Sequence, residues 1–369
     1  LLNTIAQVTI DAYHVEAANG TPTPVGIKKH LDAFMNQNQQ AENIEASRPT
    51  FMQLVDRFVM GEMKIMNGKQ RGKDKAPNTL KSYGTTKMHL EKYQKAFRVS
   101  LDFNSITLDW YMKFTTYLKN EGLGENSIGK QVKNVKAFMQ MANKLTFEMD
   151  GKKYQYTTNK EYQEFGVTNT PADAVYLSET EIMSLYNFNL SGNKRLEAVR
   201  DLFVFGCMVG LRYSDYSSIR PENIVSMEGE LFIRTFTKKT GELVVIPCNP
   251  VVLDIFNRYE KNPNKLPRKI SDQKFNEYIK EAAKLAGLTA KGRLLTKPGL
   301  ELWECISSHT ARRSFATNYF LSGFPTIDLM KITGHKSEES FLRYIRITKE
   351  ETAKRMAEHN RRKNWAVLI

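Results

Sequence analysis

Residues 307–320 have the sequence SSHTARRSFATNYF, which places a histidine three positions before an arginine. In a helix, Arg312 would lie on the same apolar stripe as Phe315 and Tyr319, so its side chain should face the core. Charged side chains are rarely buried without a partner, and no acidic residue lies within one helical turn of Arg312. We therefore expect this arginine to bind an anion that the chain itself does not supply.

Four stretches, one of them within 307–320, carry side chains of related chemistry. GLRYSDYSSIRPENI (210–224) contains Arg212 and Asp215, KKTGE (238–242) contains Lys238 and Lys239, HTARR (309–313) contains His309 and Arg312, and ITGHKSEESFLRYIRI (332–347) contains His335 and Tyr344. Each of these residues alone has a structural explanation, such as a helix end, a charge at a hairpin tip or a half-buried tyrosine. Their combination, in contrast, indicates a shared chemical function.

Two arginines, a lysine, two histidines and a tyrosine suit the attack of a tyrosine on a phosphodiester. Arginines can hold the non-bridging oxygens and stabilise the added negative charge of the transition state. A tyrosine hydroxyl has a pKa of about 10, so it needs a cationic site or a base beside it, and a histidine fits that role. A lysine on a hairpin can protonate the 5′-oxygen that leaves.

In their order and spacing these residues resemble the tyrosine recombinases, or phage-type integrases, and in overall style the integrases of conjugative transposons and other mobile elements. The family motif of Arg, Lys, His-x-x-Arg, His or Trp, and Tyr matches at intervals of 27, 70, 3, 23 and 9 residues. The resemblance implies the following site: Arg212, Lys239, His309, Arg312, His335 and the nucleophile Tyr344, with Asp215 in support. It implies neither metal nor cofactor.

Two assignments depend on the local pattern. Lys238 and Lys239 are adjacent, and residues that follow each other in a strand point to opposite faces. We choose Lys239 as the general acid because the family lysine commonly precedes a Thr or Gly turn, which leaves Lys238 as the alternative. Arg313 stands where many relatives carry histidine, and we expect it to contact the DNA backbone or to have a structural role.

The charge of the chain favours a polyanionic partner. The 369 residues carry a net charge of +14, of which residues 51–100 supply +7 and residues 251–300 supply +6. Such focused basic blocks indicate a nucleic-acid footprint, although solvated lysine-rich surfaces would give the same count. The candidate DNA-binding residues are Lys69, Arg71, Lys73, Lys75, Lys81, Lys130, Lys133 and Lys136. The last three form a row opposite the apolar stripe of a helix within 124–144, and a purely solvated face would show the same pattern.

The pattern of apolar residues predicts a two-domain, mostly α protein with a small β-sheet or hairpin in its second half. Residues 1–45 should form two helices broken at 19–24, with the Gln/Asn-rich stretch 36–43 as a linker. Residues 50–145 look all-helical, 145–156 are short and β-like, and 230–247 should be a hairpin. By the resemblance, 1–45 are a remnant of an upstream arm-site DNA-binding region, 50–165 a helical SAM-like core-binding domain, and 174–369 an α+β catalytic domain.

Composition excludes several classes of protein. Three dispersed cysteines form no CxxC pair, so a disulfide framework and a zinc site are not expected, and a reducing cytoplasm fits. There is no apolar run of 18 residues that would indicate a membrane span. The first residue, a leucine inside an apolar pattern, suggests that the natural chain begins earlier.

We therefore expect a site-specific recombinase that integrates or excises a mobile element through a 3′-phosphotyrosyl intermediate and a Holliday junction. The resemblance implies double-stranded core sites as partner, a homotetramer on synapsed DNA and a monomer in solution, and accessory DNA-bending or excision factors are possible partners. The apolar end of the chain, residues 365–369, should dock on a neighbouring protomer or fold back onto its own domain. A type IB topoisomerase and a non-catalytic DNA-binding regulator are the alternatives.

Overall fold

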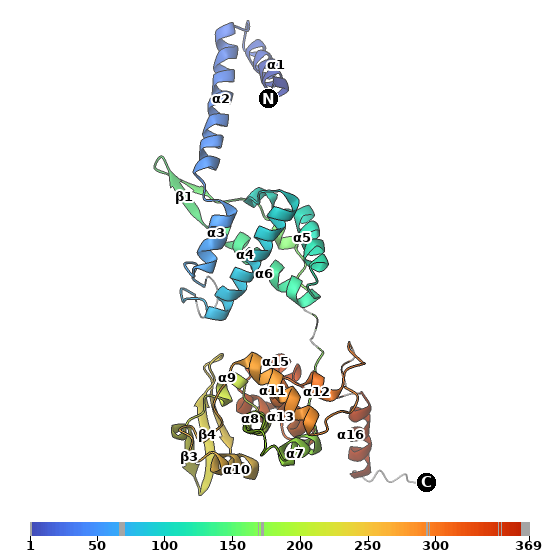
Figure 1. Ribbon diagram of the computed structural model, residues 1–369. Helices are drawn as coiled ribbons and strands as arrows, with labels where there is room; N and C mark the ends of the chain where they lie inside the picture. Colours follow the sequence, from blue (N-terminus) through green and yellow to red (C-terminus); the bar gives the residue numbers. More distant parts are fainter. Residues whose placement is uncertain are drawn as a thin grey trace, which may run out of the picture. The chain divides into compact units, whose positions relative to one another are not determined.

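The chain forms two compact units, Leu1–Thr170 and Pro171–Ile369 (Figure 1). The computed structural model describes residues 2–65, 71–168, 170, 173–292, 294, 296–345, 347 and 349–362. The first unit is helical apart from a two-stranded antiparallel sheet, whereas the second packs helices beside a three-stranded antiparallel sheet. This matches the predicted mostly α fold with a small sheet in the second half.

The first unit begins with two long helices that pack against each other and continues with a helical core. Its elements are α1 (Leu2–Ala18), α2 (Pro24–Ser47), α3 (Phe51–Val59), α4 (Pro77–Phe97), η1 (Phe103–Ser105), α5 (Leu108–Asn120), α6 (Glu125–Ala142), β1 (Thr146–Met149), β2 (Lys152–Gln155) and η2 (Glu161–Glu164). A capping box at Thr50 and Gln53 starts α3, whose apolar face is fully buried. Aromatic and aliphatic side chains of α3, α4, α5 and α6 form most of the core of this unit.

The expected linker at residues 36–43 is wrong, because α2 runs without a break from Pro24 to Ser47. Thr23 caps this helix by accepting a hydrogen bond from the Gly26 N–H, and Pro24 occupies the first turn, where its missing N–H costs nothing. Gln, Glu and Ala are good helix formers, so a polar composition alone does not mark a linker. The break between α1 and α2 lies at residues 19–23, as the turn cluster predicted.

The second unit is built around α8, a helix that is buried along most of its length. The elements are α7 (Glu179–Asn187), α8 (Lys194–Val209), α9 (Tyr213–Tyr216), η3 (Pro221–Asn223), β3 (Ile224–Met227), β4 (Glu230–Phe236), β5 (Leu243–Pro247), α10 (Pro250–Arg258), α11 (Asp272–Leu285), α12 (Leu302–Cys305), α13 (Ser308–Leu321), α14 (Thr326–Thr333), α15 (Glu338–Leu342) and α16 (Lys349–Arg362). Helices α7, α10, α11 and α13 all pack against α8. The capping box predicted at Ser178 and Glu181 starts α7.

The sheet of the second unit has the order β3–β4–β5. The predicted hairpin is β4 and β5, paired from Phe232–Pro247 to Phe236–Leu243. Strand β3 was not predicted, and it pairs with β4 from Ile224–Ile233 to Met227–Glu230. It is four residues long, and the segment IVSM is too short for an alternating pattern to be recognised.

Gly210 sets the direction in which the chain leaves α8 toward Arg212. Gly210 ends that helix with a φ of 67°, a left-handed conformation that side chains rarely adopt. A Cβ atom at this position would lie 2.3 Å from the Phe315 ring of α13. The chain can therefore turn toward Arg212 while α8 and α13 remain in close contact.

Candidate active site

Arg312 is the centre of the candidate site and is fully buried in α13, as the sequence predicted. Its Nη1 donates to the Gly210 carbonyl at 3.1 Å, and its Nη2 lies 2.9 Å from His335 Nε2. The Nε–H is buried without a hydrogen-bond partner among the described residues. Burial and the nearby Arg212 guanidinium lower the pKa of Arg312 to about 10, so the side chain stays charged at neutral pH.

His335 holds Arg312 from the other side. The guanidinium can only donate, so Nε2 of His335 accepts from it, and Nδ1–H is inferred to donate to Thr333 Oγ1 at 2.7 Å. Thr333 in turn donates to the Leu329 carbonyl. Burial, followed by the charges of Arg312 and Arg212, lowers the pKa of His335 to about 3. This imidazole is therefore neutral, and both its nitrogens are engaged.

Tyr344 lies against the same group. The Arg312 guanidinium carbon is 5.2 Å from the centroid of its ring, and the His335 ring centroid is 4.9 Å from it. A small apolar cluster that includes Phe315 and Phe341 packs beneath Tyr344 and positions this part of the chain. Tyr344 thus lies beside Arg312 and His335, although 32 and nine residues separate them in the sequence.

Arg212 and Asp215 lie at the start of α9, Asp215 within its first turn. Arg212 is the residue before that helix, and its Nη1 is buried without a hydrogen-bond partner among the residues described. Asp215 is buried; its Oδ1 accepts from the backbone N–H of Lys238, whereas its Oδ2 has no partner in the described part of the chain. Buried donors without partners require an explanation, and an anion that binds to both arginines would supply it.

Lys238 and Lys239 do not lie in a strand, contrary to our premise, because β4 ends at Phe236 and both belong to the turn that follows. Alternation between sheet faces therefore cannot distinguish them. Lys238 is tied down: its backbone N–H donates to Asp215 and its Nζ to Ser218 Oγ at 2.8 Å. Lys239 is exposed, and its side chain has no hydrogen bond or ion pair with any described residue.

His309 and Arg313 lie at the beginning of α13. His309 is exposed at the surface of the unit, yet partial burial of its ring and the adjacent Arg313 lower its pKa. Arg313 is partly buried and makes interactions of its own. The start of the helix is held by α11, because Asp272 accepts from the Ser308 hydroxyl and Asn276 from the Ser308 N–H.

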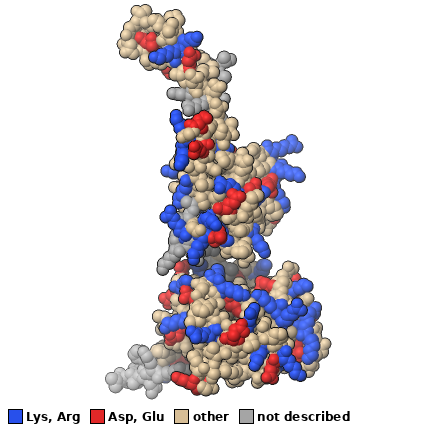
Figure 2. Space-filling view, turned by 90° about the vertical axis from the view of Figure 1, so that its left-hand side faces the viewer, with Lys and Arg blue, Asp and Glu red and all other residues tan. Residues whose placement is uncertain are grey.

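The lysines and arginine proposed to bind DNA in the first unit fall into two groups. Arg71, Lys73, Lys81, Lys130 and Lys133 are exposed. Lys69 lies outside the described residues. Basic side chains spread over the face of both units that Figure 2 shows.

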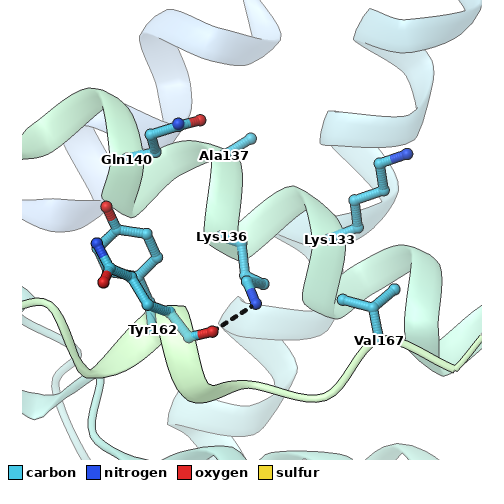
Figure 3. A pocket seen from close by; sticks show the side chains of 7 residues that line it. Lys133, Lys136, Ala137, Gln140, Tyr162 and Val167 are labelled. Carbon is cyan, nitrogen blue, oxygen red and sulfur yellow. Dashed lines mark hydrogen bonds between the residues drawn. The ribbon is translucent and has the colours of Figure 1, made fainter.

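Lys75 and Lys136 are instead bound to their own domain. Lys75 Nζ donates to the Tyr83 hydroxyl and lies 4.4 Å from the centroid of the Phe58 ring, and burial lowers its pKa. Lys136 borders a pocket of about 570 Å³ on α6 (Figure 3), and its Nζ donates to the carbonyls of Gln163 and Phe165. Both ammonium groups already have partners, so they are weaker candidates for DNA contacts than Lys133 on the rim of the same pocket.

Three residues near the site were not predicted from the sequence. Thr333 binds the His335 ring and orients it. The Ser218 hydroxyl accepts a hydrogen bond from Lys238 Nζ, and Lys269 Nζ lies 3.4 Å from the same hydroxyl. Burial and the Lys238 ammonium lower the pKa of Lys269. Their sequence signals are weak because Ser, Thr and Lys are common on any surface, and only the contacts reveal their relation to the site.

The comparisons with known proteins agree with this geometry. Residues 176–351 match the model of the phage integrase family, and residues 63–155 match that of the phage integrase SAM-like domain. The chain belongs to the phage integrase family. It is accordingly a site-specific recombinase, an enzyme of the tyrosine recombinase type. A search of curated proteins gave no match.

Solved structures show the same fold. A lambda integrase dimer bound to a COC′ core site matches with a TM-score of 0.60 and 15% identity, covering 87% of this chain and 86% of that one. The Tn1549 transposon integrase in complex with transposon right end DNA matches at 0.56 and 18%, covering 84% and 99%. XerH recombinase in a post-cleavage complex with a palindromic difH substrate matches at 0.57 and 14%, covering 75% and 79%.

The described residues contain neither a membrane-spanning helix nor a candidate metal cluster. None of the described helices is both long and apolar enough to cross a lipid bilayer. Nor does any group of three or more His, Cys, Asp or Glu side chains in this part of the chain form a candidate metal site.

Proposed function

We propose that Tyr344 attacks a DNA phosphate held by Arg212 and Arg312, forming a 3′-phosphotyrosyl bond. The observation that carries this proposal is a pair of buried guanidinium N–H groups, one on each arginine, that have no hydrogen-bond partner among the described residues, together with the Tyr344 ring beside Arg312. Two arginines can bind both non-bridging oxygens of one phosphate and stabilise the charge that develops in the transition state.

The proton transfers follow from the remaining groups. As the oxygen of Tyr344 bonds to phosphorus, the bond from phosphorus to the 5′-oxygen breaks, and Lys239 gives its proton to that oxygen. His335 is neutral, but Arg312 occupies its Nε2, so it gains a free nitrogen for the tyrosine proton only if Arg312 turns to the phosphate. His309, whose lowered pKa favours the neutral form, is the second candidate acceptor.

At the level of the assembly, we propose that four copies exchange strands between two core sites through a Holliday junction. In support, one structure with this fold is a lambda integrase tetramer bound to a Holliday junction, at a TM-score of 0.59 and 16% identity. The fold likeness to a transposon integrase supports integration and excision of a mobile element as the role. We propose that the protein acts in the bacterial cytoplasm. The proposed tail contact involves residues 365–369, which lie outside the described residues.

The test is covalent trapping on a nicked suicide substrate that carries the end of the host element. Wild-type protein should form an adduct that resists denaturation, whereas Tyr344→Phe should bind the same DNA and form none, because it lacks only the attacking oxygen. An adduct at the wild-type rate with Tyr344→Phe would refute the assignment. Relaxation of supercoiled plasmids without paired sites would favour the topoisomerase alternative, and failure of the wild-type protein to form any adduct would favour a regulator.

A further inference from the structure

The turn between β4 and β5 is a closed loop that is tied to its surroundings on two sides. Thr237 is buried, and its N–H donates to the Glu242 carbonyl at 2.9 Å, while the Gly241 N–H donates to the Thr237 carbonyl at 2.8 Å. Thr237 and Thr240 also share a hydrogen bond between their hydroxyls at 2.6 Å. These bonds make residues 237–242 one small unit whose orientation depends on its outer contacts.

On one side the turn is attached to the α9 segment. The Lys238 N–H donates to Asp215 Oδ1 at 3.1 Å, and its Nζ donates to Ser218 Oγ at 2.8 Å. The bond to Asp215 is strengthened by the charge of its buried carboxylate. The bond to Ser218 lies at the surface and ties the Lys238 side chain to the residues that follow α9. Both acceptors lie within six residues of Arg212.

On the other side the turn is attached to the segment that carries His335. Thr240 Oγ1 donates to the Gly334 carbonyl at 3.4 Å, and Glu242 forms an ion pair with Lys336 at 2.8 Å. Gly334 has a φ of 67°, and a Cβ atom there would lie 3.1 Å from Thr237 Cγ2, so the two segments touch closely. The turn thus bridges the segments that hold Arg212 and His335.

The two lysines of the turn differ in this arrangement. Lys238 uses both its backbone and its side chain as attachments, whereas the side chain of Lys239 makes no hydrogen bond or ion pair within the described ranges. The geometry points to Lys238 as a positioning residue that holds the turn through Ser218 and Asp215, so that Lys239 reaches the leaving 5′-oxygen. This inference rests on the proposed function, which makes Lys239 the proton donor.

A substrate with sulfur in place of the bridging 5′-oxygen separates positioning of the acid from other roles. A thiol has a pKa of about 8.5, far below that of an alcohol, so a thiolate leaves without a proton donor. Lys239→Met should lose about 100-fold or more in the cleavage rate of the oxygen substrate, which is the usual contribution of a general acid. On the sulfur substrate it should cleave nearly as fast as the wild type.

Lys238→Met should also cleave the oxygen substrate more slowly than the wild type, but with a smaller loss of rate than Lys239→Met. We expect the rate on the oxygen substrate to fall about tenfold, the effect of one hydrogen bond made by a charged group, with recovery on the sulfur substrate. Lys238→Arg keeps a donor for Ser218 and should restore most of the rate. The double variant Lys238→Met/Ser218→Ala should be no slower than Lys238→Met alone, because both changes break one link.

Lys269→Met is the matched control, since Lys269 Nζ lies 3.4 Å from the same hydroxyl but Lys269 is not part of the turn. Any loss of rate in this variant should be equal on the two substrates. The inference is overturned if Lys238→Met is unaffected, if it slows equally on both substrates, or if Lys269→Met is rescued by sulfur. It is also overturned if Lys239→Met keeps its rate, because Lys238 would then be the acid itself. Failure of the wild-type protein to form any adduct would instead refute the proposed function.

Discussion

Replacing Arg312 with lysine should reduce DNA cleavage far more than DNA binding. The change keeps the positive charge but replaces a planar fork of five N–H donors with a single ammonium group. In the structure the fork spans the Gly210 carbonyl and His335 Nε2, at 3.1 Å and 2.9 Å, and keeps a buried Nε–H for a further acceptor. An ammonium group cannot reach both sides and still bind a phosphate.

These contacts determine the expected losses of stability and of cleavage rate. The lysine can satisfy only one of the two acceptors, the Gly210 carbonyl or His335 Nε2. The other is left without a donor, which costs about 1–3 kcal/mol of the unfolding free energy. For a unit of this size, that lowers the melting temperature by roughly 2–12 °C. Loss of one donor to the transition state should slow cleavage by about 10²–10³-fold. Affinity for a core site should change by less than about threefold, because the net charge is unchanged.

The assay is single-turnover cleavage of a nicked substrate, measured with saturating protein well below the melting temperature, alongside thermal unfolding and DNA binding. Arg313→Lys is the matched control, because it makes the same change at the next position of α13. Cleavage by Arg312→Lys within about threefold of the wild-type rate would refute the reasoning. Equal losses of binding and cleavage would show instead that Arg312 is a general DNA contact.

Further predictions concern the histidine and the surface lysines. The unfolded chain protonates His335 below about pH 6.5, but the folded chain does so only near pH 3. The unfolding free energy should therefore decrease as the pH is lowered through this window, and at pH 5 it should be about 2 kcal/mol smaller than at neutral pH. Denaturant titrations of His335→Gln should lack this part of the pH dependence. His14→Gln, at an exposed position, is the control and should retain it. The same dependence of unfolding free energy on pH in His335→Gln and wild type would contradict the assignment. Lys130→Gln and Lys133→Gln should each reduce the slope of log affinity against log salt by about 0.9, and an unchanged slope would mean a merely solvated face. Lys136→Met should leave that slope nearly unchanged and lower the unfolding free energy by about 1 kcal/mol, because its ammonium group already binds two carbonyls.

Much of the site could be predicted from the sequence because its chemistry is carried by residue types in a fixed order. Arg312 was expected to be buried and to need an anion, since it lies on an apolar helical stripe without an acidic neighbour, and the structure places it at the centre of the second unit without exposure. Helix starts such as that at Ser178 were equally accessible, because a capping box lies within four consecutive residues.

Contacts between distant segments were not accessible in this way. Arg312 donates to Gly210, 102 positions earlier, and Ser218 binds Lys238 rather than Lys239. Both contacts depend on how α8, α9, α13 and the turn between β4 and β5 come together. The same holds for Lys75 and Lys136, which look like solvated cations in the sequence but bind a tyrosine hydroxyl and two carbonyls. A helical or strand period reports which face of an element is buried, because it is a property of neighbouring residues. Which atom a polar side chain meets there is decided only when elements far apart in the chain come together, because hydrogen bonds act over about 3 Å and carry no sequence period.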